Sequence, residues 1–136
     1  MKIVIDNNII LDALLERQPF NEAAKQILTA CADIHKGSLS ANSLTDIFYV
    51  LQKLISAAEA KNAVKRLMGL LEIISVDEED CLNALSLAID DFEDALVIIC
   101  AKKAGADYIA TRDKPLLKTN SPIPIVTPDK LLEILK

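Results

Sequence analysis

The sequence predicts a parallel α/β domain, and two observations carry that prediction. Short apolar runs alternate along the chain with segments whose apolar residues recur every three or four positions, as strands alternate with helices. The first apolar run, residues 3–5, ends abruptly on Asp6, and Asn7 and Asn8 follow before the helical spacing begins. A buried parallel strand that leads into a helix has this form, and ligands bind beyond the carboxyl ends of such strands.

Five strands and seven helices are expected. The strands are short runs rich in apolar or small residues, at residues 3–5, 37–41, 73–76, 108–110 and 125–126. The helices carry apolar residues at helical spacing, over residues 8–16, 21–31, 44–54, 56–67, 77–88, 92–104 and from 127 onwards.

Several of these helices carry a start or stop signal. Asn21 and Thr127 have side chains that favour the N-cap position, and Ser56 begins a Ser-Ala-Ala-Glu capping box. The acidic run at residues 77–80 favours the positive end of a helix that carries Leu82, Leu85 and Ala88 as its apolar residues. Gly105 is a natural residue to end the helix before the fourth strand.

The length and the cysteines point to one domain in a reducing compartment. With 136 residues the chain can form one domain over residues 1–136 with its own core. No apolar run approaches the roughly 20 residues that cross a bilayer, and Asp6 interrupts the N-terminus before a signal peptide could form. Cys31, Cys81 and Cys100 are far apart within apolar helical patterns, so we expect buried free thiols and a cytoplasmic location.

The charge and the histidine count exclude some function classes. A net charge of −5 argues against a protein that binds nucleic acid by electrostatic attraction alone. It does not exclude an enzyme whose acidic cluster is neutralised by divalent cations. The single histidine, His35, lies in a polar connection and is expected to be an ordinary surface residue. A Ser-His-Asp relay or a zinc site would have little else to use.

Four aspartates fall at the edges of the predicted elements. Asp6 ends the first strand, Asp46 lies near the start of the helix after the second strand, and Asp113 follows the fourth strand. Asp94 lies in the first turn of the helix before that fourth strand. Strand ends and helix starts can converge on one edge of a parallel sheet, where clustered carboxylates would repel one another. Clusters of oxygen ligands suit Mg²⁺ or Mn²⁺.

Each acid also has an ordinary structural explanation. Asp91 is best explained as a helix N-cap, Asp46 alone would favour a helix N-terminus, and Asp113 alone could be a turn residue. Asp12 and Glu16 lie one helical turn apart and are expected on a solvated face. It is the shared placement of the four acids at one edge that favours a cation site.

Three segments resemble the PIN-domain nucleases, a family named for the PilT N-terminus. Residues 5–12 are similar to the family's opening, in which an Asp stands two residues before an Asn and an apolar helix follows. Residues 43–46, Ser-Leu-Thr-Asp, resemble its middle segment. The stretch from Asp91 to Asp113, with Gly105 and Thr111-Arg112-Asp113, is the most specific part of a likeness that spans essentially the whole chain.

The resemblance implies metal-dependent hydrolysis of RNA on a three-layer sandwich, with helices around a central, mostly parallel five-stranded sheet. It implies a catalytic set of Asp6, Asp46, Asp94 and Asp113, of which Asp6, Asp94 and Asp113 bind Mg²⁺ or Mn²⁺. Asn8 would orient a ligand or a water, and Thr111 would support the ligands. Because water is the expected nucleophile, the products would carry 5′-phosphate and 3′-hydroxyl ends.

The chain departs from the family pattern at two positions. Asp46 stands where a Glu is common, so it acts either through a water or as a weaker ligand. Asn7 stands where Thr or Ser is usual. Beside Asp113, Arg112 and Lys114 are candidates for phosphate contacts, and a solvated loop explains them equally well.

The resemblance extends to the toxins of bacterial toxin–antitoxin pairs, and a housekeeping ribonuclease stays open. The implied partners are RNA, an antitoxin protein and a second copy of the chain.

The main rival is a phospho-acceptor receiver domain that would use Asp77 and Lys114, but Asn7 and Asn8 stand where its acidic pair should continue. Asn8 also replaces the second Asp of a phosphatase loop. An inactive PIN-like scaffold that binds RNA or protein is the remaining alternative.

Overall fold

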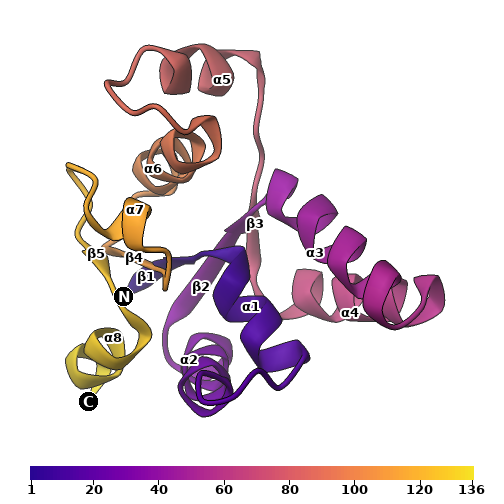
Figure 1. Cartoon of the computed structure of the whole chain (residues 1–136). Coiled ribbons are helices and arrows are strands. Elements are labelled where there is room, and N and C mark those ends of the chain that lie inside the picture. Colours follow the sequence, from indigo (N-terminus) through magenta and orange to yellow (C-terminus); the bar gives the residue numbers. More distant parts are fainter.

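The computed structural model describes residues 1–136 and is built on a five-stranded sheet in which every pairing is parallel (Figure 1). The strands are β1 Lys2–Ile5, β2 Lys36–Ser40, β3 Glu72–Ile74, β4 Tyr108–Ala110 and β5 Ile125–Val126. Their order in the sheet is β3-β2-β1-β4-β5. The predicted parallel α/β fold is therefore confirmed. Because β1 is the central strand, its carboxyl end lies in the middle of one sheet edge.

Eight helices connect and cover the strands. They are α1 Asn7–Leu14, α2 Asn21–Asp33, α3 Ala41–Leu54, α4 Ala57–Leu70, α5 Glu78–Leu85, α6 Phe92–Ala104, α7 Lys114–Leu117 and α8 Pro128–Leu135. Seven were predicted, and the short α7 was not. None of the eight combines the length and the apolarity that a membrane-spanning helix needs.

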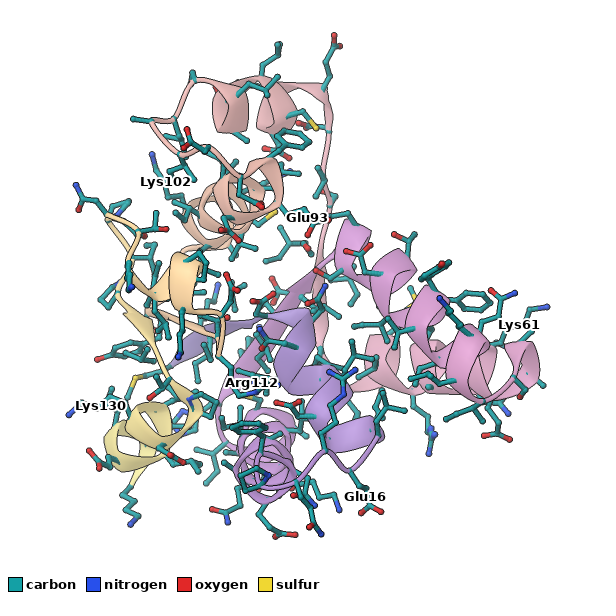
Figure 2. The ribbon with its side chains drawn as sticks, viewed as in Figure 1. Glu16, Lys61, Glu93, Lys102, Arg112 and Lys130 are labelled. Atoms are coloured by element: carbon teal, nitrogen blue, oxygen red, sulfur yellow. The ribbon has the colours of Figure 1, made fainter.

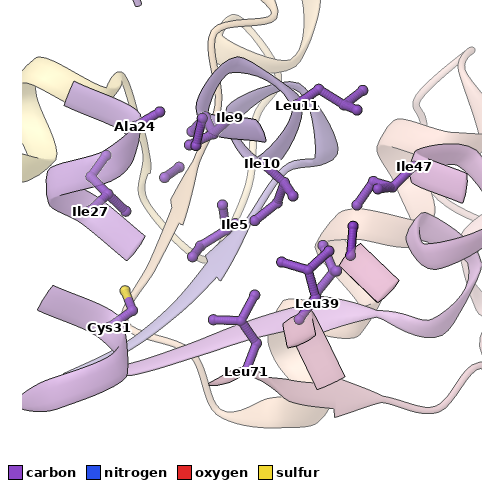
Figure 3. Close-up of a cluster of buried hydrophobic side chains, with 14 of the residues drawn as sticks. Ile5, Ile9, Ile10, Leu11, Ala24, Ile27, Cys31, Leu39, Ile47 and Leu71 are labelled. Atoms are coloured by element: carbon purple, nitrogen blue, oxygen red, sulfur yellow. The ribbon is translucent and has the colours of Figure 1, made fainter. Parts of the chain in front are cut away.

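The alternation of side chains along β1 divides the core between the two faces of the sheet. Ile3 and Ile5 point to the face covered by α1 to α4 and α8, where the largest apolar cluster lies (Figure 3). Val4 points to the opposite face, where it packs with Ile98 of α6 and Ile109 of β4. The helix α5 packs outside α6 and does not reach the sheet core. This arrangement confirms the three-layer sandwich.

The start and stop signals are mostly confirmed. Ser56, Asp77 and Thr127 each accept a hydrogen bond from a backbone N–H in the first turn of the helix that follows. Gly105 ends α6 with φ at 65°, a left-handed conformation that a residue without a Cβ adopts without strain. The prediction for Asn21 was wrong, because Asn21 is the first residue of α2 and is buried, and no side chain caps that helix.

The predicted apolar face of α5 was also wrong. Leu82 and Leu85 are 61% and 68% exposed, while Asp80 and Ala84 are buried. Asp80 Oδ2 accepts from Lys103 Nζ at 2.8 Å, and Ala84 packs against α6. An ion pair and a small residue therefore decide which face of α5 meets α6, and the leucines are left outside.

The single histidine lies away from the carboxyl edge of the sheet, and none of the three cysteines forms a disulfide. His35 precedes β2 at the opposite edge, with its Nδ1 at 3.2 Å from the N-terminal amine. All three cysteines are free thiols, with Cys31 and Cys100 buried and Cys81 half-buried. Burial raises the pKa of the Cys31 and Cys100 thiols to about 11, so both are protonated at neutral pH.

Candidate metal centre

The carboxyl ends of β1, β2 and β4 surround a small pocket of about 210 Å³ that is lined almost entirely by polar residues. We call it the acidic pocket. Its acidic side chains are Asp6, Asp46, Asp91, Glu93, Asp94 and Asp113. Its amide and hydroxyl side chains are Asn7, Asn8, Asn42 and Ser43. The four aspartates singled out from the sequence therefore line one pocket, although they come from distant parts of the chain.

Three of these six acids are held in place as helix N-caps. The Asp6 carboxylate caps α1 by accepting from the Asn7 backbone N–H at 2.8 Å. Asp113 caps α7 by accepting from the Leu116 N–H at 3.1 Å, and Asp91 caps α6 by accepting from the Asp94 N–H at 3.0 Å. The positive end of each helix favours a carboxylate there. Capping thus explains the placement of these acids, while their side chains still line the pocket.

Asp6 is held by two further side chains. Thr111 Oγ1 donates to Asp6 Oδ2 at 2.6 Å, and Asn8 Nδ2 donates to the same oxygen at 3.2 Å. Asn8 Oδ1 in turn accepts from the Arg112 backbone N–H at 3.4 Å. Thr111 is wholly buried. These contacts fix the Asp6 carboxylate at the end of β1 and link it to the segment that follows β4.

Asp46 lies one turn inside α3, because this helix begins at Ala41 and not at Leu44 as predicted. Its only side-chain hydrogen bond is a long one, from Asn7 Nδ2 at 3.5 Å. Asp46 is therefore held less firmly than Asp6.

The electrostatics of the acidic pocket disfavour charge on Asp6 and Asp94. Burial, followed by the nearby carboxylates of Asp113 and Asp46, raises the pKa of Asp6 although hydrogen bonds from Thr111 and Asn7 oppose this. Burial and the charges of neighbouring carboxylates raise the pKa of Asp94 to about 6. None of the protein's ion pairs involves an acid of this pocket. No cation of the protein therefore lies within ion-pair distance of these carboxylates.

The donor set of the acidic pocket fits a hard divalent cation. All of its acids and amides offer oxygen atoms, and the buried Asn42 Oδ1 has no hydrogen-bond partner. No three His, Cys, Asp or Glu side chains stand close enough to hold one ion without moving. Mg²⁺ is commonly held by only one or two carboxylates, with waters and substrate phosphates completing its shell. Repulsion keeps unneutralised carboxylates apart, so a pocket of separated carboxylates is compatible with such an ion.

Sequence reasoning gave no site role to several residues of this pocket, Glu93 and Asn42 among them. Glu93 lies in the space between α6 and α3 (Figure 2), where burial and the Asp46 charge raise its pKa. Asn42 was not singled out at all. Asp91 was assigned only to the cap, yet it also lines the pocket. A Glu beside a helix cap and an Asn at a helix start carry no local signal of a site.

The prediction that Asp12 lies on a solvated face was wrong. Asp12 is only 1% exposed, and the Arg112 guanidinium binds both its oxygens, with Nε at 2.6 Å from Oδ2 and Nη2 at 2.9 Å from Oδ1. The Arg17 guanidinium is 3.8 Å away, and the face of Phe20 packs 3.8 Å from Arg112 Cζ. Glu16 is exposed as expected and pairs with Lys25. Asp12 is buried because β1 and β4 are neighbours, which brings the segment after β4 against α1.

The Asp12–Arg112 ion pair bears on the two candidate phosphate contacts, Arg112 and Lys114. Arg112 is committed to Asp12 and does not line the acidic pocket. Lys114 is exposed at the start of α7 and lines a different hollow, beside Phe20. The structure therefore brings neither cation into the acidic pocket.

The residues of the rival receiver domain have structural roles. Asp77 caps α5 in a reciprocal capping box with Asp80 and lies 4.0 Å from Lys103 Nζ. Lys114 and Pro115 form the first turn of α7. Neither Asp77 nor Lys114 lies in the acidic pocket.

Comparisons with known proteins agree with the fold. A curated relative, ribonuclease VapC1 of Aquifex aeolicus, is 28% identical over 138 residues, covering 97% of this chain and 94% of the relative. Among solved structures, VapBC2 of Rickettsia felis bound to a promoter DNA fragment superposes with a TM-score of 0.68 at 17% identity, covering 93% and 98% of the two chains. VapC20 of Mycobacterium tuberculosis, described as a sarcin-ricin loop cleaving toxin, gives 0.68 at 16% identity over 84% and 92%.

The family itself is shown by a match to a family model described as PIN domain. That match covers residues 2–115, which include all four aspartates of the predicted catalytic set. The chain belongs to the PIN-domain family.

Proposed function

We propose that the protein is a divalent-metal-dependent endoribonuclease that hydrolyses RNA phosphodiester bonds, and that it is the toxin of a toxin–antitoxin pair. The observation that carries the proposal is the acidic pocket, in which several carboxylates gather at the carboxyl edge of the sheet and none of them forms an ion pair with a cation of the protein. The relative from Aquifex aeolicus is named a ribonuclease, and this supports the reaction class.

We assign the metal to Asp6, Asp94 and Asp113, with Asp46 completing the catalytic set. A bound Mg²⁺ or Mn²⁺ supplies an activated water and offsets charge at the phosphate. Thr111 and Asn8 fix the direction of the Asp6 carboxylate through their hydrogen bonds. Asp46 is shorter than the usual Glu and is loosely held, which suits contact through a water. The products would carry 5′-phosphate and 3′-hydroxyl ends.

An antitoxin and a second copy of the chain are the proposed protein partners. Two of the similar structures are described as a toxin–antitoxin complex and as VapBC bound to DNA. The helices α3 and α4 lie side by side (Figure 1). They and the residue that follows α3 carry exposed apolar side chains that a protein partner could cover, namely Tyr49, Leu54, Ile55, Met68 and Leu70. Mass measurement by light scattering would show whether the isolated chain is a dimer.

The test is incubation of structured RNA with purified protein and Mg²⁺ or Mn²⁺. We expect cleavage by the wild type, and loss of cleavage in Asp6→Asn, in Asp94→Asn and on addition of a chelator. Asp33→Asn is the matched control, because Asp33 is an exposed acid at the end of α2 that has no part in the pocket.

Equal cleavage by all of these proteins would assign the activity to a contaminant and contradict the proposal. Binding of RNA with no cleavage by any form would favour the inactive scaffold. An activity that requires Asp77 and acetyl phosphate, with no effect on RNA, would favour the receiver.

A further inference from the structure

The acidic pocket continues into a second, wider hollow of about 590 Å³, because Asp91 and Asp94 line both. We call this hollow the lysine groove, since Lys102 and Lys118 lie on its walls. Its floor is partly apolar, with Leu87 and Ile89 among the lining side chains.

Two helices lead from the acidic pocket to the lysines of this groove. In α6, Asp94 lies in the first turn and Lys102 in the last, and Ile98 between them lines the same groove. At a rise of about 1.5 Å per residue, Lys102 lies roughly 12 Å along the helix from Asp94. In α7, Asp113 is the N-cap and Lys118 the C-cap. Each helix therefore has a carboxylate of the acidic pocket at its N-terminal end and a lysine of the groove at its C-terminal end.

Neither lysine has a partner within the protein. No hydrogen bond or ion pair involves the Nζ atom of Lys102 or of Lys118, and both side chains are exposed. The adjacent Lys103 shows the contrast, because its Nζ donates to Asp80 at 2.8 Å and to the Ser75 carbonyl oxygen at 3.0 Å. Two unpaired cations beside an acidic pocket, in a protein of net charge −5, suit an anionic ligand that runs out of that pocket.

We propose that the lysine groove holds the RNA strand next to the bond that is cut, with Lys102 and Lys118 contacting its phosphates. This inference rests on the proposed function. A span of about 12 Å corresponds to roughly three stacked nucleotides at ~3.4 Å each. No aromatic side chain lines the groove, so base stacking does not contribute, and the contacts follow the sugar–phosphate backbone without reading sequence.

The test is RNA binding by the Asp6→Asn protein, which keeps the RNA intact, measured by fluorescence anisotropy with a labelled single strand in Mg²⁺ buffer. We add Lys102→Ala, Lys118→Ala or both to that variant. Lys61→Ala is the control, because Lys61 is an exposed lysine without a partner that Figure 2 shows on the opposite side of the molecule.

Each lysine variant should weaken binding by roughly three- to fivefold, the range of an exposed charge pair, and the double variant by about tenfold. The slope of log affinity against log salt should fall by about 0.7 for each phosphate that the variant no longer neutralises. The dependence on Lys102 should disappear with a dinucleotide, which is too short to reach it. Lys61→Ala should change neither affinity nor slope.

Unchanged affinity and salt slope in the double variant would overturn the inference, even when the wild type cleaves RNA. An equal loss of affinity in Lys61→Ala would overturn it as well, since the effect would then come from net charge. Lysine-dependent binding by a wild type that cuts no RNA would refute the hydrolysis and leave the groove as the RNA-binding surface.

Discussion

Asp6 and Asp12 lie six residues apart at the end of β1 and within α1, and they have opposite electrostatic surroundings. Asp12 is almost wholly buried, and Arg112 binds both of its oxygens while Arg17 lies nearby. Asp6 is partly buried, with neutral donors on Thr111 and Asn8 and with further carboxylates around it. A buried charge needs compensation. Asp12 has a charged partner within the fold, whereas Asp6 has only hydrogen bonds from neutral groups.

A similar contrast exists between Arg112 and Asp113, two adjacent residues that follow β4. The Arg112 side chain reaches back to α1 and completes the Asp12 pair, while the Asp113 side chain lines the acidic pocket. The ion pair therefore fixes the backbone from which a catalytic candidate projects. We infer that Asp12 and Arg112 serve stability, and that Asp6 and Asp113 serve function.

The largest expected effect is a loss of stability when the Asp12–Arg112 ion pair is broken. Arg112→Met leaves Asp12 buried with only the more distant Arg17, so the free energy of unfolding should fall by about 3–5 kcal/mol. Urea denaturation measures this. Arg66→Met, at an exposed arginine of α4, is the control and should change stability little. A double variant, Asp12→Leu with Arg112→Met, should recover much of the lost stability, and no recovery would contradict the assignment of Asp12 as the unpaired charge.

The next largest effect is on the rate of RNA cleavage when an acid of the acidic pocket is replaced. Asp94→Asn should lower the rate of RNA cleavage by roughly a hundredfold or more, the range seen when a group that stabilises transition-state charge is removed. Asp46→Asn should cost less, because a contact through water is more easily replaced. Initial rates with a fluorescent RNA would compare the two. A larger drop in rate for Asp46→Asn than for Asp94→Asn would make Asp46 a direct ligand.

A smaller drop in activity or metal affinity is expected when the hydroxyl group that orients Asp6 is removed. Thr111→Val keeps the shape of this buried residue and removes the hydroxyl that donates to Asp6 Oδ2. Activity or metal affinity should fall roughly 10- to 100-fold, as for other residues that support a metal ligand. Thr111→Ser keeps the hydroxyl and should retain most activity. Equal drops in the two variants would point to packing and not to the hydrogen bond.

The smallest effect is on stability as a function of pH. The pKa of Asp94 is raised to about 6 in the folded protein, so folding favours its protonated form. The resulting destabilisation is complete above that pKa and is relieved as the pH falls from 7 to 5, so the metal-free protein should become more stable over this range. Asp80 has the opposite sign, because Lys103 lowers its pKa, and its contribution is lost only at pH values below about 4.

Thermal unfolding at each pH, without metal, measures this profile. In Asp94→Asn the gain between pH 7 and 5 should shrink, and the variant should be more stable than the wild type at pH 7. A wild-type stability that falls steadily from pH 7 to 5 would contradict the repulsion inferred for the acidic pocket.

The sequence predicted the acids of the site better than the pairing of Asp12. Asp6 and Asp113 were visible because each follows a strand, and the ends of parallel strands meet at one edge. The Asp12–Arg112 pair joins residues 100 positions apart, and only the adjacency of β1 and β4 brings them together. Local pattern contains no information about that adjacency.

Other misses have similar causes. The helix α7 has only four residues and follows Asp113 directly, so its sequence resembles a turn. On α5, hydrophobicity predicted that Leu82 and Leu85 would be buried. The ion pair of Asp80 with Lys103 instead places the opposite face of the helix against α6 and leaves both leucines exposed. Glu93 and Asn42 reached the pocket through helix orientation alone, which the residue types do not indicate.

The most direct test of the central claim is calorimetric titration of the metal-free protein with Mn²⁺, without RNA. We predict saturable binding by the wild type and by Asp33→Asn, and its loss or strong weakening in Asp6→Asn and Asp94→Asn. Far-ultraviolet circular dichroism would confirm that each variant is folded. Mn²⁺ binding by Asp6→Asn as tight as that of the wild type, or none by the wild type, would contradict the claim that the acidic pocket is kept for a cation.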